Sequence, residues 1–130
     1  MKGFTLVEIM IVVAIIALLA ALAIPGFLRA RVRAQASAVL NDARVLDGIV
    51  SQYMLEQNLI TVPAGAVSAF SDELTPYVKD NSKLIENNFQ DRFSNDFDVT
   101  SDGTLTISSS TIDDLTATGA VDEAFFDGYR

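Results

Sequence analysis

Residues 9–28 read IMIVVAIIALLAALAIPGFL, a run of 20 residues that contains no charged side chain. A helix that crosses a membrane needs about 20 mostly apolar residues. Lipid offers no hydrogen-bond partner to a bare backbone, so such a segment has to be helical. The run predicts a membrane-spanning helix, which the largely apolar residues before it lengthen to residues 4–28.

The helical pattern continues beyond this run. Apolar residues recur at steps of three and four, as one face of a helix does, at Leu28, Val32, Ala36, Val39, Ala43, Leu46, Val50 and Tyr53. The opposite face carries Arg29, Arg33, Arg44, Asp47 and Gln52. We expect one helix with a spanning half, residues 4–28, and an amphipathic half, residues 29–57, ending at Asn58 as the C-cap. Pro25 and Gly26 predict a kink, because proline donates no backbone hydrogen bond and clashes one turn back.

Charge and composition exclude several classes of function. Residues 1–47 hold five basic and three acidic side chains, whereas residues 48–130 hold four basic and fourteen acidic ones. An acidic C-terminal part repels phosphate, so we expect no nucleic-acid partner. The chain has no Cys and no His, which removes thiol nucleophiles, disulfides and imidazole bases.

The apolar run alone leaves three interpretations open. It fits a signal peptide cut after Ala23, a plain membrane anchor, or a helix used in assembly. Glu8 separates them, because a carboxylate inside a span costs about 2.5–3.5 kcal/mol on insertion scales. Neither a signal peptide nor a simple anchor has a use for this charge, so Glu8 favours an assembly role.

The segment Lys2-Gly3-Phe4-Thr5-Leu6-Val7-Glu8 resembles the processing and methylation signal of type IV prepilins and pseudopilins. That family has a short basic leader ending in Gly, a Phe after the cut, a Glu four residues later, and a long apolar helix with a Pro. The resemblance covers about the first 50 residues.

The resemblance implies that residues 1–3 are a leader removed by a prepilin peptidase between Gly3 and Phe4, and that Phe4 is then N-methylated. It implies that Glu8 pairs with the new Phe4 amine, in its own helix or in the adjacent subunit, because a paired ion costs less in hydrocarbon than a lone one. The expected product is a structural subunit without enzymatic activity. It would wait in the inner membrane as a single-span precursor until an assembly machinery polymerises it into a helical filament of identical copies, outside the cell or in the periplasm.

Two alternatives remain. The major pseudopilin of a type II secretion system shares the same signal. A secreted acidic binding module, released by signal peptidase, would instead begin at Ile24.

Residues 58–130 predict a small globular region. Around Asp102 and Gly103 the sequence FDVTSDGTLTIS, residues 97–108, alternates as strands do. A three-residue loop, residues 101–103, would pair Val99 with Leu105 and Phe97 with Ile107, which puts all four on one face and needs Gly103 in the left-handed region. We therefore expect an α+β fold, with a small antiparallel sheet packed on the amphipathic half of the helix.

The rest of the globular region is less patterned. Residues 58–70 predict a loop with a short strand, and Ser71 predicts the N-cap of a short helix limited by Pro76. Phe89, Phe93 and Phe97 could form one helical face or three separate core contacts.

The C-terminal tail carries several carboxylates, namely Asp113, Asp114, Asp122, Glu123 and Asp127. Such clusters can bind calcium, and the resemblance to secretion pseudopilins allows it at the first four of these residues. Their spacing matches no EF-hand loop, so we expect a solvated acidic tail and no cofactor. Asp113 and Asp114 are not a catalytic dyad, since no nucleophile accompanies them.

Overall fold

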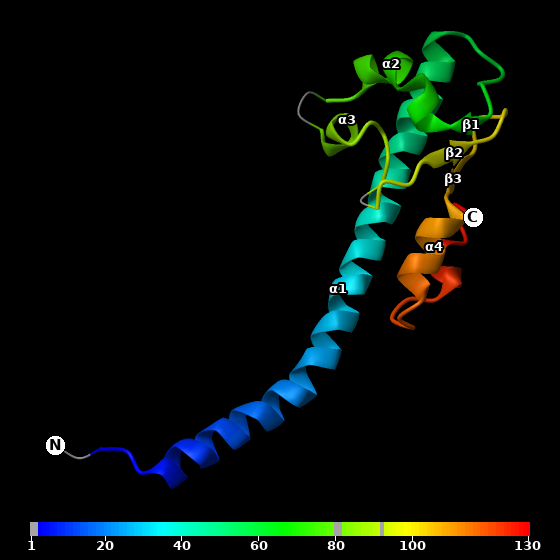
Figure 1. The fold of residues 1–130 in the computed structure, drawn as a ribbon. Coiled ribbons are helices and arrows are strands. Elements are labelled where there is room, and N and C mark those ends of the chain that lie inside the picture. Colours follow the sequence, from blue (N-terminus) through cyan, green and yellow to red (C-terminus); the bar gives the residue numbers. More distant parts are fainter. Residues whose placement is uncertain (1–2, 80–81, 92) are drawn as a thin grey trace.

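The computed structural model describes residues 3–79, 82–91 and 93–130 (Figure 1). Lys2, the basic residue of the predicted leader, lies outside the described residues. One long helix forms the axis of the molecule, and everything after it folds against the far end of that helix (Figure 1). The expected α+β architecture is confirmed.

The helix α1 runs from Leu6 to Glu56, 51 residues, and it contains Pro25. Its C-cap is Gln57, and Asn58, the predicted cap, follows with a φ of 53°. The Leu59 N–H donates to the Met54 carbonyl oxygen at 2.8 Å, which closes the last turn as a left-handed residue after a helix allows. The prediction placed the cap one residue too late.

The predicted apolar face of α1 is the buried face from Ala36 onward. Ala36, Val39, Ala43, Leu46 and Val50 are buried, together with Ile49, whereas Val32 and Tyr53 are half-buried. Leu28, which begins the apolar repeat within the predicted spanning half, is 51% exposed. Figure 1 shows the reason: the globular region covers only the C-terminal part of the helix.

The sheet has three antiparallel strands in the order β1 (Gly65–Ala66), β2 (Phe97–Val99) and β3 (Leu105–Ile107). Phe97 pairs with Ile107 and Val99 with Leu105, so the predicted register is confirmed. Gly103 has a φ of +87°, in the region that favours glycine. The short strand expected between residues 58 and 70 is β1, which pairs with β2.

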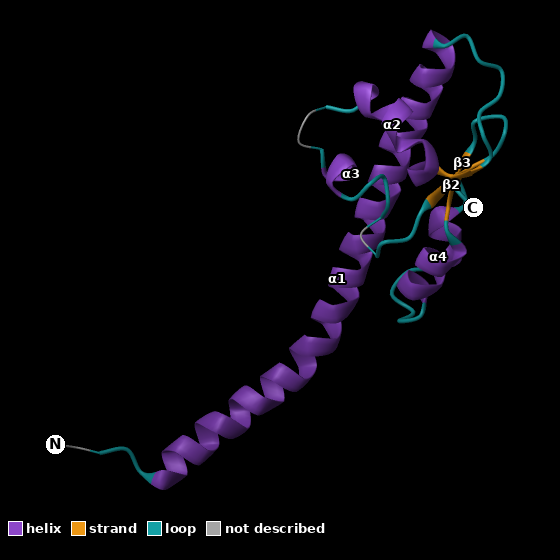
Figure 2. Cartoon of the chain, turned by 45° about the horizontal axis from the view of Figure 1, so that its top comes forward, coloured by secondary structure: helices purple, strands orange, loops and turns teal. Residues whose placement is uncertain are grey.

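Short helical turns connect β1 to β2. They are η1 (Val67–Phe70), α2 (Ser71–Leu74), η2 (Thr75–Tyr77) and α3 (Lys83–Glu86), and Figure 2 labels α2 and α3. Ser71 was wrong as an N-cap: it is the first helical residue of α2, and its carbonyl oxygen accepts from the Thr75 hydroxyl at 2.8 Å. Pro76 lies within η2, where α2 has already ended.

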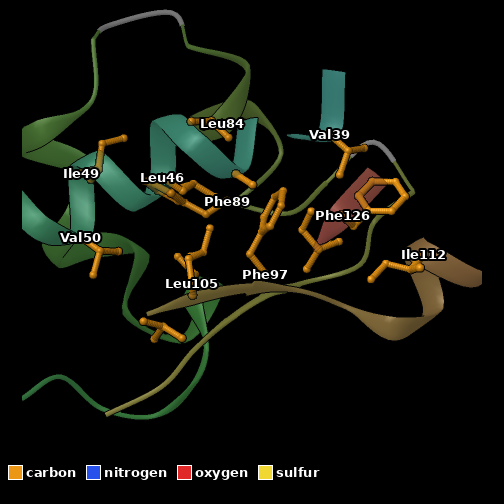
Figure 3. Close-up of a cluster of buried hydrophobic side chains, with 14 of the residues drawn as sticks. Val39, Leu46, Ile49, Val50, Leu84, Phe89, Phe97, Leu105, Ile112 and Phe126 are labelled. Atoms are coloured by element: carbon orange, nitrogen blue, oxygen red, sulfur yellow. The ribbon is translucent and has the colours of Figure 1, made fainter. Parts of the chain in front are cut away.

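The three phenylalanines do not form one helical face. Phe89 and Phe97 are buried and Phe93 is half-buried; Phe89 and Phe93 lie in two separate turns, and Phe97 lies in β2. Figure 3 shows the side chains of Phe89 and Phe97 pointing into the core beside Leu46 of α1. They are therefore separate core contacts.

The C-terminal tail is more structured than expected. It forms α4 (Ser109–Thr116) and η3 (Glu123–Phe126), neither of which was predicted. Ile112, Leu115 and Phe126 are buried in the core, while Asp113 and Asp114 on the other side of α4 are exposed. The tail is acidic and solvated on one face only, because its apolar face closes the core (Figure 3).

Candidate assembly helix and N-terminal site

The N-terminal residues stand apart from the folded region. Residues 3–5 precede α1 and are exposed, with Phe4 83% exposed. A Cβ added to Gly3 would meet no heavy atom within 4 Å. The Gly3–Phe4 bond therefore lies in accessible, non-helical backbone, which is the form that a peptidase requires.

Glu8 closes a capping box at the start of α1. Its Oε2 accepts from the Thr5 N–H and the Thr5 hydroxyl, both at 2.8 Å, and its own N–H donates to Thr5 Oγ1 at 3.2 Å. Such a box satisfies backbone donors that a helix start leaves open, and a carboxylate there suits the helix dipole. Sequence reasoning missed this use of Glu8, although the Thr-x-x-Glu spacing is its standard signal.

A surface hollow of about 420 Å³ adjoins this cap and is lined by Gly3, Phe4, Thr5 and Glu8. A second hollow, of about 320 Å³, is lined by Phe4, Glu8 and the apolar Ile9, Ile11 and Val12. A carboxylate thus borders two shallow, mainly apolar surfaces. Chemically, this arrangement can receive a cation attached to an apolar group.

The first part of α1, residues 6–28, is named here the span half. Its side chains are exposed, apart from half-buried Ala20, and they include many large apolar ones such as Leu22, 74% exposed. Over the described residues, α1 is the one helix long and apolar enough to cross a membrane, and none of its most apolar window is buried. The globular region leaves most of this surface uncovered.

Pro25 and Gly26 lie inside α1, which continues through both. Pro25 has no N–H to donate to the carbonyl of Ala21 one turn back. Figure 1 shows the helix axis bent between its dark-blue and cyan parts. The kink assigned to Pro25 and Gly26 stays a prediction, because a bend spread over several turns does not identify its cause.

The acidic tail does not assemble a metal site among the residues that the structure describes. Asp113 and Asp114 lie on α4, and Asp122 caps η3. Glu123 accepts from Arg130 Nη2 at 2.6 Å, so it already has a cationic partner.

A buried polar cluster, the Asp91 clasp, was not anticipated from the sequence. The Asp91 side chain is 4% exposed, and its Oδ1 accepts from the N–H groups of Phe93 at 2.8 Å and Asn95 at 3.0 Å. Its Oδ2 accepts from the buried Thr111 hydroxyl, which also accepts from Asn95 Nδ2 at 3.1 Å. The clasp joins the loop before β2 to α4, and no local sequence signal reveals a contact over this separation.

Comparison with known proteins connects these features to a family. The prokaryotic N-terminal methylation motif matches residues 1–24. The type IV major pilin protein PilE1 of Neisseria gonorrhoeae is 40% identical over 80 residues, 60% of this chain and 37% of that protein. The type IV wide pilus major component PilA4 of Thermus thermophilus is 42% identical over 78 residues, 58% of this chain and 57% of that protein.

The major pilin protein PilA of Myxococcus xanthus is 49% identical over 45 residues, 35% of this chain and 20% of that protein. The chain thus spans less than two thirds of the length of these relatives, and no solved structure matches it. The relatives are structural pilins rather than enzymes. The chain therefore shares the N-terminal methylation motif and part of its sequence with type IV pilins, and it combines them with a long helix that carries a small antiparallel sheet at its far end.

Proposed function

We propose that the chain is the structural subunit of a type IV pilus-like filament and polymerises through the span half of α1. The observation that carries this proposal is the exposure of that half, of whose most apolar window 0% is buried. A contiguous apolar surface of this size is not left in water by a soluble protein. Lipid covers it in the precursor, and the same helices of other copies cover it in the filament.

Maturation precedes assembly in this proposal. A prepilin peptidase cuts between Gly3 and Phe4 at the inner membrane and methylates the Phe4 amine. The matched methylation motif and the accessible backbone at Gly3 support this step. The cut leaves a cationic amine on Phe4, two residues before Leu6, the first residue of α1.

Glu8 then supplies the charge that the amine needs. In the monomer both hydrogen bonds from Thr5 end on Glu8 Oε2. The apolar hollows beside Glu8 suit an incoming Phe4, whose ring and amine would meet apolar wall and carboxylate together. Burying the two ions as a pair avoids the penalty of burying either alone. The pair would set the register between one subunit and the next.

An assembly machinery draws the precursor out of the inner membrane and adds it to the growing filament. Each subunit uses different surfaces toward its two neighbours, a contact that does not close and so builds an open fibre. The named relatives are pilus components, which favours a surface pilus over the pseudopilus alternative. The secreted-module alternative is disfavoured, because a motif for N-terminal methylation occupies residues 1–24.

The test replaces Glu8 by Gln in the full chain. Gln also serves at this position of a capping box, so the helix start is kept while the charge is removed. The variant is expected to reach the membrane, to begin at Phe4 by mass spectrometry, and to lose filaments almost completely. Breaking a buried ion pair costs about 3–5 kcal/mol per contact, and electron microscopy of sheared filaments measures the loss.

Two variants serve as controls. Gly3→Val should leave the leader uncut, which marks the mass expected for failed processing. Glu8→Ala removes both charge and cap. Wild-type filament yield from Glu8→Gln together with loss from Glu8→Ala would assign Glu8 to the helix cap and refute the pairing role. A mature chain beginning at Ile24 would refute the filament proposal itself.

A further inference from the structure

A basic collar follows the span half directly. Arg29, Arg31 and Arg33 are exposed and lie within five residues of Leu28, the last residue of the apolar run. Basic residues normally gather on the cytoplasmic side of a span, and here Lys2 is the only basic residue before it. In the proposed precursor the three arginines lie on the opposite side. Their position runs against the usual preference of basic residues for the cytoplasmic side, which indicates that they have a function on the opposite side.

The collar borders a groove of about 510 Å³ between α1 and the loop after α4. Pro25, Leu28 and Val32 provide apolar lining, and Arg29 and Arg31 provide positive charge. Thr118 lines the groove from the other side. Figure 1 shows this orange loop as the part of the globular region nearest the span half.

A hydrogen bond between α1 and the loop after α4 joins the two sides of the groove. Arg33 Nε donates to the carbonyl oxygen of Ala120 at 2.9 Å, across 87 residues of sequence. Ala120 is buried and adjoins the turn at Gly119, whose φ is 64°. This bond fixes the loop that carries Thr118 against α1, so the groove is a property of the folded monomer.

The groove lies at the level along α1 that the lipid phosphates of one leaflet would occupy. Residues 9–28 as a helix are about 30 Å long, which equals the hydrocarbon thickness of a typical bilayer. Arg29 and Arg31 then come within about 5 Å of its edge, at the depth of the lipid phosphates. Guanidinium groups bind phosphate through paired hydrogen bonds.

The geometry points to a site for one anionic phospholipid of the leaflet from which the helix emerges. Arg29 and Arg31 bind the phosphate, and Pro25, Leu28 and Val32 contact the glycerol and the first carbons of the chains. This inference rests on the proposed membrane-spanning precursor, but not on polymerisation. The site would orient the acidic globular region above an anionic surface that otherwise repels it.

A second copy of the chain is the other candidate occupant, since residues 48–130 are strongly acidic. The lipid is favoured because the apolar lining of the groove is continuous with the lipid-facing surface at Pro25 and Leu28. An acidic protein surface would leave that lining without an apolar partner.

Native mass spectrometry of the full chain in detergent tests the assignment. The protein is titrated with phosphatidylglycerol or phosphatidylcholine, which share glycerol and chains but differ in net charge. We expect one phosphatidylglycerol bound in preference to phosphatidylcholine. The double variant Arg29→Gln/Arg31→Gln should reduce that preference about 30-fold, because each basic side chain near an anionic surface contributes about fivefold.

Arg44→Gln is the matched control, because Arg44 is exposed on the same helix well beyond the groove. It should keep the preference, and Arg29→Lys/Arg31→Lys should keep part of it. Equal binding of the two lipids by the wild type would overturn the proposal, as would an unchanged preference in the double Gln variant. Lipid-independent dimers that disappear in that variant would assign the groove to a second copy instead. None of these outcomes depends on whether filaments form.

Discussion

The two halves of α1 share one backbone but meet different surroundings. The span half, residues 6–28, is exposed throughout most of its circumference, whereas the packed half, residues 29–56, buries one face under the sheet and α4. The span half is apolar all round, and the packed half is apolar on one stripe only. The width of the apolar surface therefore distinguishes the two halves better than helix formation does. A single apolar stripe is covered by the globular region, and a surface that is apolar all round is not.

The comparison also separates two kinds of stability. Contacts of the packed half belong to the monomer and stabilise its fold. In the proposed function, contacts of the span half are with lipid or with other copies, so they would contribute to insertion and assembly instead. Substitutions in the packed half should therefore lower the stability of the fold, and substitutions in the span half should instead impair insertion or assembly.

The largest expected difference comes from leucine truncation. Leu46 is fully buried in the packed half, and Leu18 is 64% exposed in the span half. Leu46→Ala should lower the free energy of unfolding of the globular region by about 2–5 kcal/mol, as buried leucines do. Leu18→Ala should leave it unchanged. Calorimetry of the full chain in detergent measures both, and equal losses would mean that the two halves are not independent.

A smaller effect is expected at the hairpin turn that packs on α1. A Cβ at Gly103 would overlap Met54 Sδ of the packed half, and its φ of +87° is strained for any other residue. Gly103→Ala should cost about 1–2 kcal/mol from backbone strain, and more where Met54 cannot move. Gly26→Ala in the span half, where an added Cβ meets nothing within 4 Å, should cost the globular region nothing.

Gly119 separates strain from overlap in this prediction. Its φ is +64°, yet an added Cβ there would meet no heavy atom within 4 Å. Gly119→Ala should therefore show the strain alone, and Gly103→Ala should exceed it. Melting midpoints of the two variants in the reverse order would contradict the packing of the turn on α1.

The smallest expected effect is a loss of stability of the globular region at low pH. The Thr100 hydroxyl, followed by the Thr104 N–H at 3.2 Å, lowers the pKa of Asp102 in the same turn. A lowered pKa gives stability that is present above the unfolded pKa, about 3.9, and is lost as pH falls through the folded pKa. Asp102 lies in the turn between β2 and β3, so this response belongs to the globular region.

Asp102→Asn should accordingly be less stable than the wild type at pH 7 and approach it near pH 2. Denaturant unfolding at several pH values measures the gap. If the difference in free energy of unfolding between the two proteins stays constant from pH 7 to pH 2, then ionisation of Asp102 does not stabilise the fold.

Sequence reasoning predicted the parts of the fold that repeat over short distances. The stripe from Ala36 to Val50 follows helical spacing, and the pairing of Val99 with Leu105 follows from alternation and one glycine. It missed α4, because eight residues give little periodicity and Ser, Thr and Asp dominate them. The short helix near Ser71 was predicted from its local signals with the cap one residue off, whereas the four-residue helix at Lys83, which Ser82 caps, was not predicted.

The candidate sites divide in the same way. Gly3, Phe4 and Glu8 are adjacent in sequence, so a motif reveals them. The contact of Arg33 with Ala120 and that of Asp91 with Thr111 join residues far apart in the chain. Such contacts depend on how the C-terminal segment returns to α1, which no single stretch of sequence specifies.

The Asp91 clasp has a consequence for where this protein can mature. It fastens α4 to the loop before β2 by hydrogen bonds between buried groups, in a chain that has no cysteine. A fastening made of hydrogen bonds consumes no oxidant and needs no thiol-exchange enzyme, and it forms as soon as the segments meet. The attachment of the C-terminal region is therefore equally stable in reducing and in oxidising surroundings. A fibre built from this chain would keep the same surface structure in both.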